Sequence, residues 1–117
     1  MIVHPSSPLR SIPRAELERI YLRKERFWPD GNAIVALNLP SADPLRLAFS
    51  TEVLHSDPEQ LATYWNREYF QGVRPPIVLQ STAAVRAYVA ATPVAIGYIA
   101  EAAVDATVTA IRVSDGH

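Results

Sequence analysis

Residues 33–54 constrain the fold most, because they join an apolar strand directly to a capped helix. Apolar residues run almost without interruption from Ile34 to Leu39, a pattern typical of a strand buried on both faces. Asp43 and Pro44 follow, and these residue types favour the N-cap and the first position of a helix. Apolar side chains then recur at helical spacing, at Leu45, Ala48, Phe49 and Val53. The stretch predicts a strand, a loop and a helix.

The same alternation continues along the rest of the chain. The Asp-Pro start signal recurs at Asp57–Pro58, before a helix that we expect to reach about Phe70 and to stop at Gly72. Two further helices are expected, one capped by Ser11 and ending near Lys24, the other capped by Ser81 or Thr82 and ending at Thr92. Four further short apolar segments predict strands at 2–4, 77–79, 95–99 and 108–113.

Strands that alternate with helices predict an α/β fold. We expect a mostly parallel sheet of about five strands with helices on both faces. The link from Ala100 to Thr107 is shorter than a parallel crossover usually needs, so the last strand either runs antiparallel or follows a single helical turn. No repeat, low-complexity run or linker divides the chain, which predicts one domain over residues 1–117.

Composition excludes several classes of protein. The chain of 117 residues is 49% hydrophobic and 20% charged, which is typical of a globular protein. Its net charge of −1 argues against nucleic-acid partners, and the absence of cysteine excludes disulfides and thiolate metal sites. No apolar run approaches the ~20 residues of a membrane span, so membrane insertion is not expected. The first residues, MIVHP, do not have the pattern of a signal peptide.

Three hydroxyl-rich loops follow strands and precede helices, at residues 5–11, 40–44 and 80–82. In an open α/β sheet, ligands bind beyond the carboxyl ends of the strands, and free N–H groups at helix N-termini favour anions there. If the strands are neighbours, the loops converge on one site for a small oxyanion. Its candidate contacts are Ser7, Ser41, Arg46, Ser81 and Thr82.

A simpler interpretation stands beside this one. Serine and threonine cap helices whether or not a ligand binds. Asp43 lies at the same helix end as Ser41, where a carboxylate competes with an anion, and Arg46 can serve to neutralise Asp43.

Other residues give no sign of catalysis. His4, His55 and His117 have no partner at metal-ligand spacing, and Tyr64 and Trp65 lie at helical spacing that favours core packing. The sequence contains no glycine-rich phosphate loop, nucleophile elbow or H-E-x-x-H motif. We therefore expect a protein that is not an enzyme and that needs no cofactor and no metal.

Several segments resemble one family. Residues 16–24 (ELERIYLRK) and 28–31 (WPDG) resemble the "I-F-L-G-K … W-x-D-G" segment of the phosphate-binding proteins of ABC transporters. Residues 64–76 contain Tyr-Trp, Phe-x-Gly and Pro-Pro in the order found in a short subgroup of that family, and residues 95–98 (AIGY) are similar to its "G-A-I-G-Y" strand. These landmarks occur in order over nearly the whole chain.

The resemblance implies one lobe of a type II periplasmic-binding-protein fold, exported to the periplasm. In that family a tetrahedral oxyanion lies between two lobes, and an "S-G-T" stretch before a helix holds phosphate through hydroxyls and amides. The matching place here is residues 41–46, where Ser41 and Arg46 have suitable chemistry. A transporter or sensor component, or a second copy in a homodimer, is the implied partner.

Two hypotheses of function remain. The first is a small solute-binding protein for phosphate or a similar oxyanion, linked to ABC-type transport or sensing. The second is a protein-interaction module that keeps the fold but has lost the ligand, with a transporter, a sensor or another copy as its partner.

Overall fold

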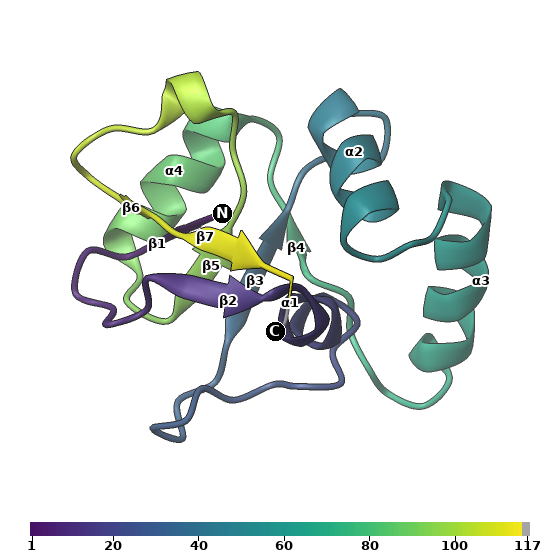
Figure 1. Ribbon diagram of the computed structural model, residues 1–117. Coiled ribbons are helices and arrows are strands. Elements are labelled where there is room, and N and C mark those ends of the chain that lie inside the picture. Colours follow the sequence, from purple (N-terminus) through teal and green to yellow (C-terminus); the bar gives the residue numbers. More distant parts are fainter. Residues whose placement is uncertain (116–117) are drawn as a thin grey trace.

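The structure, a computed structural model, describes residues 1–115 and has a five-stranded sheet covered by helices (Figure 1). The predicted domain of residues 1–117 also includes Gly116 and His117, which lie outside the described residues. Helices are α1 (Arg14–Tyr21), α2 (Pro44–Glu52), α3 (Pro58–Tyr69), α4 (Thr82–Ala91) and the 3₁₀ turn η1 (Glu101–Ala103). Strands are β1 (Ile2–Val3), β2 (Ser11–Pro13), β3 (Val35–Asn38), β4 (Ile77–Val78), β5 (Ala95–Gly97), β6 (Thr109–Ala110) and β7 (Arg112–Ser114).

The five-stranded sheet has the order β4-β3-β5-β1-β6. β3 pairs in parallel with β4 and with β5, whereas β1 pairs antiparallel with β5 and with β6. β6 therefore points the same way as β5, and β1 is inserted between them in the opposite direction. The predicted mostly parallel sheet is confirmed, and η1 corresponds to the second of the two alternatives for the link before the last strand, a single helical turn.

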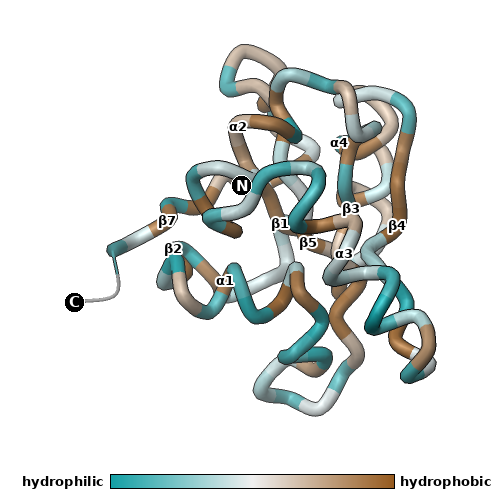
Figure 2. Tube along the Cα trace, turned by 90° about the vertical axis from the view of Figure 1, so that its right-hand side faces the viewer, coloured by the Kyte–Doolittle hydropathy of each residue, from teal (hydrophilic) through white to brown (hydrophobic). Residues whose placement is uncertain are grey.

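Helices cover the two faces of this sheet. Figure 2 shows α1 and the β2–β7 pair on one side of the strands and α4 on the other. α4 packs closely against β5: a Cβ placed on Gly97 of β5 would lie only 2.6 Å from Cγ1 of Val85. Glycine at this position thus lets α4 pack directly against the sheet. Val85 and Val89 of α4 are fully buried there.

The N-terminal prediction was wrong in detail. Ser11 does not cap a helix: it begins β2, which pairs in parallel with β7, and α1 starts at Arg14 after an uncapped Pro13. The helix ends at Tyr21 rather than near Lys24. The N–H of Lys24 donates to the carbonyl of Arg19 at 2.8 Å, and Arg23 takes a left-handed φ of 62°. This arrangement is the Schellman motif, which usually places glycine where Arg23 lies.

The last predicted strand, 108–113, is divided between two sheets. β6 continues the large sheet beside β1, whereas β7 pairs with β2. The division falls at Ile111, whose N–H donates to the carbonyl of Met1, while the N–H of Arg112 donates to the carbonyl of Arg10. The apolar run alone carried no sign of this change of partner.

The predicted starts of the other three helices are confirmed. Asp43 accepts a hydrogen bond from the N–H of Leu45 at the start of α2. Asp57 forms a capping box with Gln60 at the start of α3, and Ser81 accepts from the N–H of Ala84 at the start of α4. Each cap satisfies a backbone donor that the first helical turn leaves unpaired.

An aromatic cluster joins α1, α2 and the residue that follows β5. The ring of Phe49 stacks on that of Tyr98 at 4.4 Å and meets the ring of Tyr21 edge-on at 4.6 Å. All three side chains are buried. Tyr21 also donates its hydroxyl to the carbonyl of Leu37 at 2.7 Å, so the cluster ties both helices to the central strands.

Candidate functional site

The carboxyl ends of β3 and β4 lie side by side. In their parallel pairing Asn38 of β3 is opposite Val78 of β4, and the N–H of Leu79 donates to the carbonyl of Asn38 at 2.9 Å. The loop with Ser41 leaves β3 at this end, and the loop with Ser81 leaves β4 at the same end. Two of the three loops predicted to converge are therefore neighbours in the sheet.

A buried polar network fixes the end of β3. The Asn38 side-chain oxygen accepts hydrogen bonds from the hydroxyl of Tyr98 and from the N–H of Leu39. Burial raises the pKa of Tyr98 to about 12, against a smaller lowering by its hydrogen bond with the backbone of Leu39 and by the charge of Arg46. The phenol thus stays protonated and can keep donating to Asn38 at physiological pH.

Arg46 is held close to this network. Its guanidinium donates to the carbonyl of Leu39 at 2.9 Å while the side chain remains partly exposed. A guanidinium has five N–H donors, so one bond to a carbonyl orients the group and leaves donors for a ligand. Arg46 lies in the first turn of α2, which places a positive charge near the positive end of the helix dipole.

The backbone at the N-terminus of α2 has few free N–H donors for an anion. Pro44 has no N–H, and the N–H of Leu45 is already donated to Asp43 at 2.9 Å. The carboxylate that competes with an anion is thus the N-cap of α2. Oxyanion binding at this place depends on side chains, above all on Arg46.

A pocket of about 160 Å³ opens between α2 and α3 beside Arg46. Ser41 and Arg46 line it together, as the sequence predicted for one site. Ser50 also lines it, although only 5% of this residue is exposed. The other lining residues are mainly apolar: Leu47, Pro58, Leu61, Ala62 and Trp65.

The hydroxyl of Ser50 has a distinct position in this pocket. Among residues 1–115 it makes no side-chain hydrogen bond, whereas Thr51 and Thr63 both donate to carbonyls one helical turn back. Nevertheless, no side-chain oxygen in this part of the chain is both sealed from solvent and unpaired. The hydroxyl of Ser50 thus retains access to space, and the space that this residue lines is the pocket.

The remaining predicted residues lie elsewhere. Ser81 and Thr82 are at the same end of the sheet as Ser41, but they do not line the pocket with Arg46. The prediction that Ser7 joins them was wrong. Because β1 runs antiparallel to its neighbours, the loop that follows it emerges at the amino ends of the parallel strands. Ser7 therefore lies at the opposite end of the sheet.

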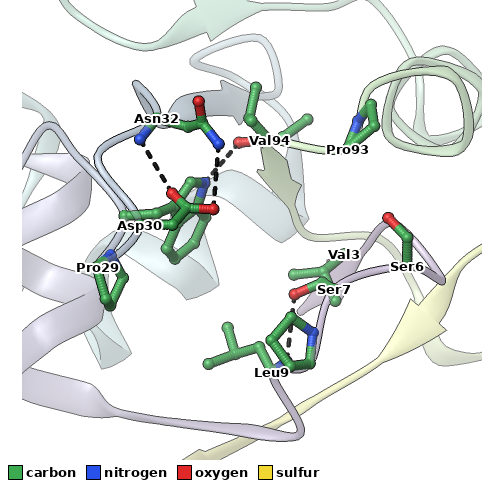
Figure 3. Close-up of a pocket in the computed structure, with 12 residues that line it drawn as sticks. Val3, Ser6, Ser7, Leu9, Pro29, Asp30, Asn32, Pro93 and Val94 are labelled. Carbon is green, nitrogen blue, oxygen red and sulfur yellow. Dashed lines mark hydrogen bonds between the residues drawn. The ribbon is translucent and has the colours of Figure 1, made fainter.

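Ser7 lines a second and larger pocket, of about 380 Å³, at that opposite end (Figure 3). Ser7 and Leu9 form one side of it, and Asp30 and Asn32 form another. Its walls are mostly proline and aliphatic groups together with Trp28, whose indole N–H donates to the carbonyl of Val94 at 2.9 Å. Among the described lining residues the charged one is Asp30, so this pocket does not suit an anion.

Helical spacing was the signal that could have extended the candidate site. Ser50 follows Arg46 by four residues, which places both on one face of α2. Leu61 and Trp65 are likewise four apart on α3. Trp65 packs against the core, as its helical spacing predicted, and it also forms part of the wall of the pocket. The sequence did not indicate that α2 and α3 lie on opposite sides of one pocket, so the two pairs could not be assigned to the same site.

The described residues provide neither a cluster of metal ligands nor a membrane-spanning helix. Within residues 1–115 no group of three or more His, Asp or Glu side chains is placed to hold a metal ion. In the same part of the chain, no helix is both long and apolar enough to cross a membrane.

Three solved structures have the fold of this chain. One, from Clostridium perfringens, is assigned as a phosphate ABC transporter substrate-binding protein and contains bound phosphate; it matches with a TM-score of 0.77 and 23% identity, over 99% of this chain and 44% of its own. An ABC-type phosphate transport receptor from Vibrio cholerae matches with a TM-score of 0.77 and 18% identity, over 96% of this chain and 44% of its own. PstS from Borrelia burgdorferi matches with a TM-score of 0.73 and 18% identity, over 99% of this chain and 47% of its own.

These likenesses establish the fold. The chain has the α/β architecture of one part of phosphate ABC transporter substrate-binding proteins and spans less than half the length of each. The three neighbours are binding or transport proteins rather than enzymes. No protein-family model and no curated protein matches the chain.

Proposed function

We propose that this chain binds phosphate or a similar small oxyanion at the carboxyl end of β3, as a solute-binding protein linked to ABC-type transport or sensing. The observation that carries the proposal is Arg46. Its guanidinium is oriented by the carbonyl of Leu39, shares a pocket with Ser41 and retains free donors. Support comes from the fold, which the chain shares with proteins described as phosphate-binding.

The roles of the candidate residues follow from their places. Arg46 supplies the charge, and Ser41 donates a hydroxyl from the loop that precedes α2. Ser81 and Thr82, at the neighbouring strand end, are contacts only for an anion that extends toward α4. Ser7 is no longer a candidate, because its loop lies at the other end of the sheet.

The proposal includes a partner and a location. An anion held at one open face keeps part of its hydration, which weakens each contact to it. We therefore expect a second surface to close over the site: further chain, a second copy or a transporter component. Export to the periplasm belongs to the same proposal and rests on the resemblance alone.

The test is thermal unfolding with and without sodium phosphate at constant ionic strength. Ligand at about 100 times its dissociation constant should add roughly 2.7 kcal/mol of stability. Arg46→Gln should abolish the shift. Arg10→Gln is the matched control, since Arg10 also donates to backbone carbonyls, at 2.8 Å, but lies at the opposite end of the sheet.

Two outcomes would contradict the proposal. No shift with phosphate, sulfate or small carboxylates at tens of millimolar would remove the oxyanion and leave the interaction module as the remaining hypothesis. An equal loss of the shift in both arginine variants would mean that phosphate stabilises the protein through its net charge and not through binding at Arg46.

A further inference from the structure

The pocket between α2 and α3 has more space and more apolar surface than a bare phosphate can use. Its charged group, Arg46, and the hydroxyl of Ser41 come from the first turn of α2 and from the loop before it. Leu47, Leu61 and Trp65 form apolar walls between the two helices. Hydrated phosphate gains nothing from such walls, because taking an anion out of water without hydrogen bonds is costly.

We propose that the ligand is a phosphorus oxyanion that carries an apolar substituent, such as an alkyl- or aryl-phosphonate. This inference rests on the proposed oxyanion site at Arg46. The oxyanion contacts Arg46 and Ser41, and the substituent lies between α2 and α3. The volume of about 160 Å³ suits this arrangement, because an apolar protein cavity of roughly 150 Å³ accommodates benzene.

Ser50 gives independent support for a ligand inside the pocket. The residue is 5% exposed, its hydroxyl has no partner within residues 1–115, and it lies one turn beyond Arg46 on α2. This hydroxyl keeps contact with the space of the pocket. A hydroxyl is a hydrogen-bond donor, and an oxygen of a ligand held by Arg46 is a suitable acceptor. We assign Ser50 as a third contact, deeper than Ser41.

The first experiment compares dissociation constants of inorganic phosphate, methylphosphonate, propylphosphonate and phenylphosphonate by calorimetry. Each added methylene that enters the pocket should tighten binding about fourfold. Phenylphosphonate should therefore bind at least ten times more tightly than phosphate. Ser50→Ala should weaken all four probes, because the contact is to the shared oxyanion.

A pocket-filling variant separates the substituent from the oxyanion. Ala62 lines the pocket on α3 and is itself exposed, so Ala62→Phe should fill the space without disturbing the core. We expect this variant to bind phenylphosphonate no better than phosphate, while phosphate binding stays within twofold of the wild type. Ala87→Phe is the matched control, on an exposed position of α4 that lines neither pocket.

The possible results are distinguishable. Equal affinities for phosphate and phenylphosphonate, both lost in Arg46→Gln, would overturn this inference and leave the proposed function standing. A preference for phenylphosphonate that survives in Ala62→Phe would also overturn it, because the substituent would lie elsewhere. Binding of none of the four probes would overturn this inference, and a failure to bind sulfate and small carboxylates as well would overturn the proposed function.

Discussion

The two ends of the parallel strands carry pockets of different size and opposite character. At the amino end, a pocket of about 380 Å³ is lined by Asp30, three prolines and the ring of Trp28. At the carboxyl end, a pocket less than half as large is lined by Arg46 together with Ser41 and Ser50. Volume alone would select the first as a binding site. Charge selects the second for an anion.

The loops at the two ends are alike in sequence. Pro5-Ser6-Ser7-Pro8 follows β1, and Pro40-Ser41-Ala42 follows β3. Both are short, rich in proline and serine, and preceded by apolar residues. They lie at opposite ends because β1 runs against its neighbours. Loop composition therefore identifies candidates, and strand direction decides which of them can act together.

The largest expected effect tests whether the carboxyl end is anchored in the core. Phe49 of α2 stacks on Tyr98 and meets Tyr21, and it is 7% exposed. Phe49→Ala should cost about 3–5 kcal/mol of unfolding free energy, as large-to-small core substitutions do. Phe27→Ala, the same change at a side chain 62% exposed, should cost under about 0.5 kcal/mol. Urea unfolding measures both, and similar costs would contradict the anchoring.

The next effect concerns pH and belongs to the same end. The unfolded chain releases the Tyr98 proton near pH 10, whereas the folded protein holds it until about pH 12 because the phenol is buried. Between these values the folded state binds more protons, so stability falls as pH rises, by up to roughly 3 kcal/mol. Tyr98→Phe should remove this part of the alkaline loss.

Tyr69→Phe is the control for this measurement, since Tyr69 is 72% exposed. Urea unfolding of the wild type and of both variants between pH 8 and pH 12 gives the comparison. If the wild type and Tyr98→Phe lost stability in parallel over this range, the buried phenol would not be the cause. Tyr21 is also buried with a raised pKa, so some alkaline loss should persist in every variant.

Much of this fold could be predicted because its signals are local. The caps Asp43, Asp57 and Ser81 act within one helical turn, so their sequence neighbours suffice to identify them. The direction of β1 could not be predicted, since a two-residue strand carries no signal of its partners. Ser7 was assigned to the wrong end for this reason.

The candidate site was predictable to the same degree. Ser41 and Arg46 belong to one strand-loop-helix unit, and the structure keeps them in one pocket. Ser50 and Trp65 join them because α2 and α3 both line this pocket, an arrangement that depends on the whole fold. Sequence reasoning located the loop and missed the wall opposite it.

A pair of tryptophan variants sharpens the comparison of the two pockets. Trp28→Phe removes the hydrogen bond to the carbonyl of Val94 and should cost about 1 kcal/mol of stability, with phosphate affinity unchanged. Trp65→Phe removes no protein hydrogen bond within residues 1–115, so it should leave stability nearly intact and weaken phenylphosphonate instead. Unfolding curves and calorimetry on both variants test this. Weaker phenylphosphonate binding in Trp28→Phe, with binding unchanged in Trp65→Phe, would assign the ligand to the pocket at the amino end.

The smallest expected effect tests the competition between Asp43 and the anion. Asparagine caps helices about as well as aspartate, so Asp43→Asn should keep α2 while removing a negative charge beside Arg46. Two unit charges 4 Å apart interact by about 1 kcal/mol in water, so we expect phosphate to bind roughly two to five times more tightly at low salt. Asp30→Asn is the control, because Asp30 lines the pocket at the opposite end of the sheet. An equal gain in both variants would reduce the effect to net charge. A gain confined to Asp43→Asn, shrinking as added salt screens the charges, would identify the cap of α2 as the group that limits anion binding.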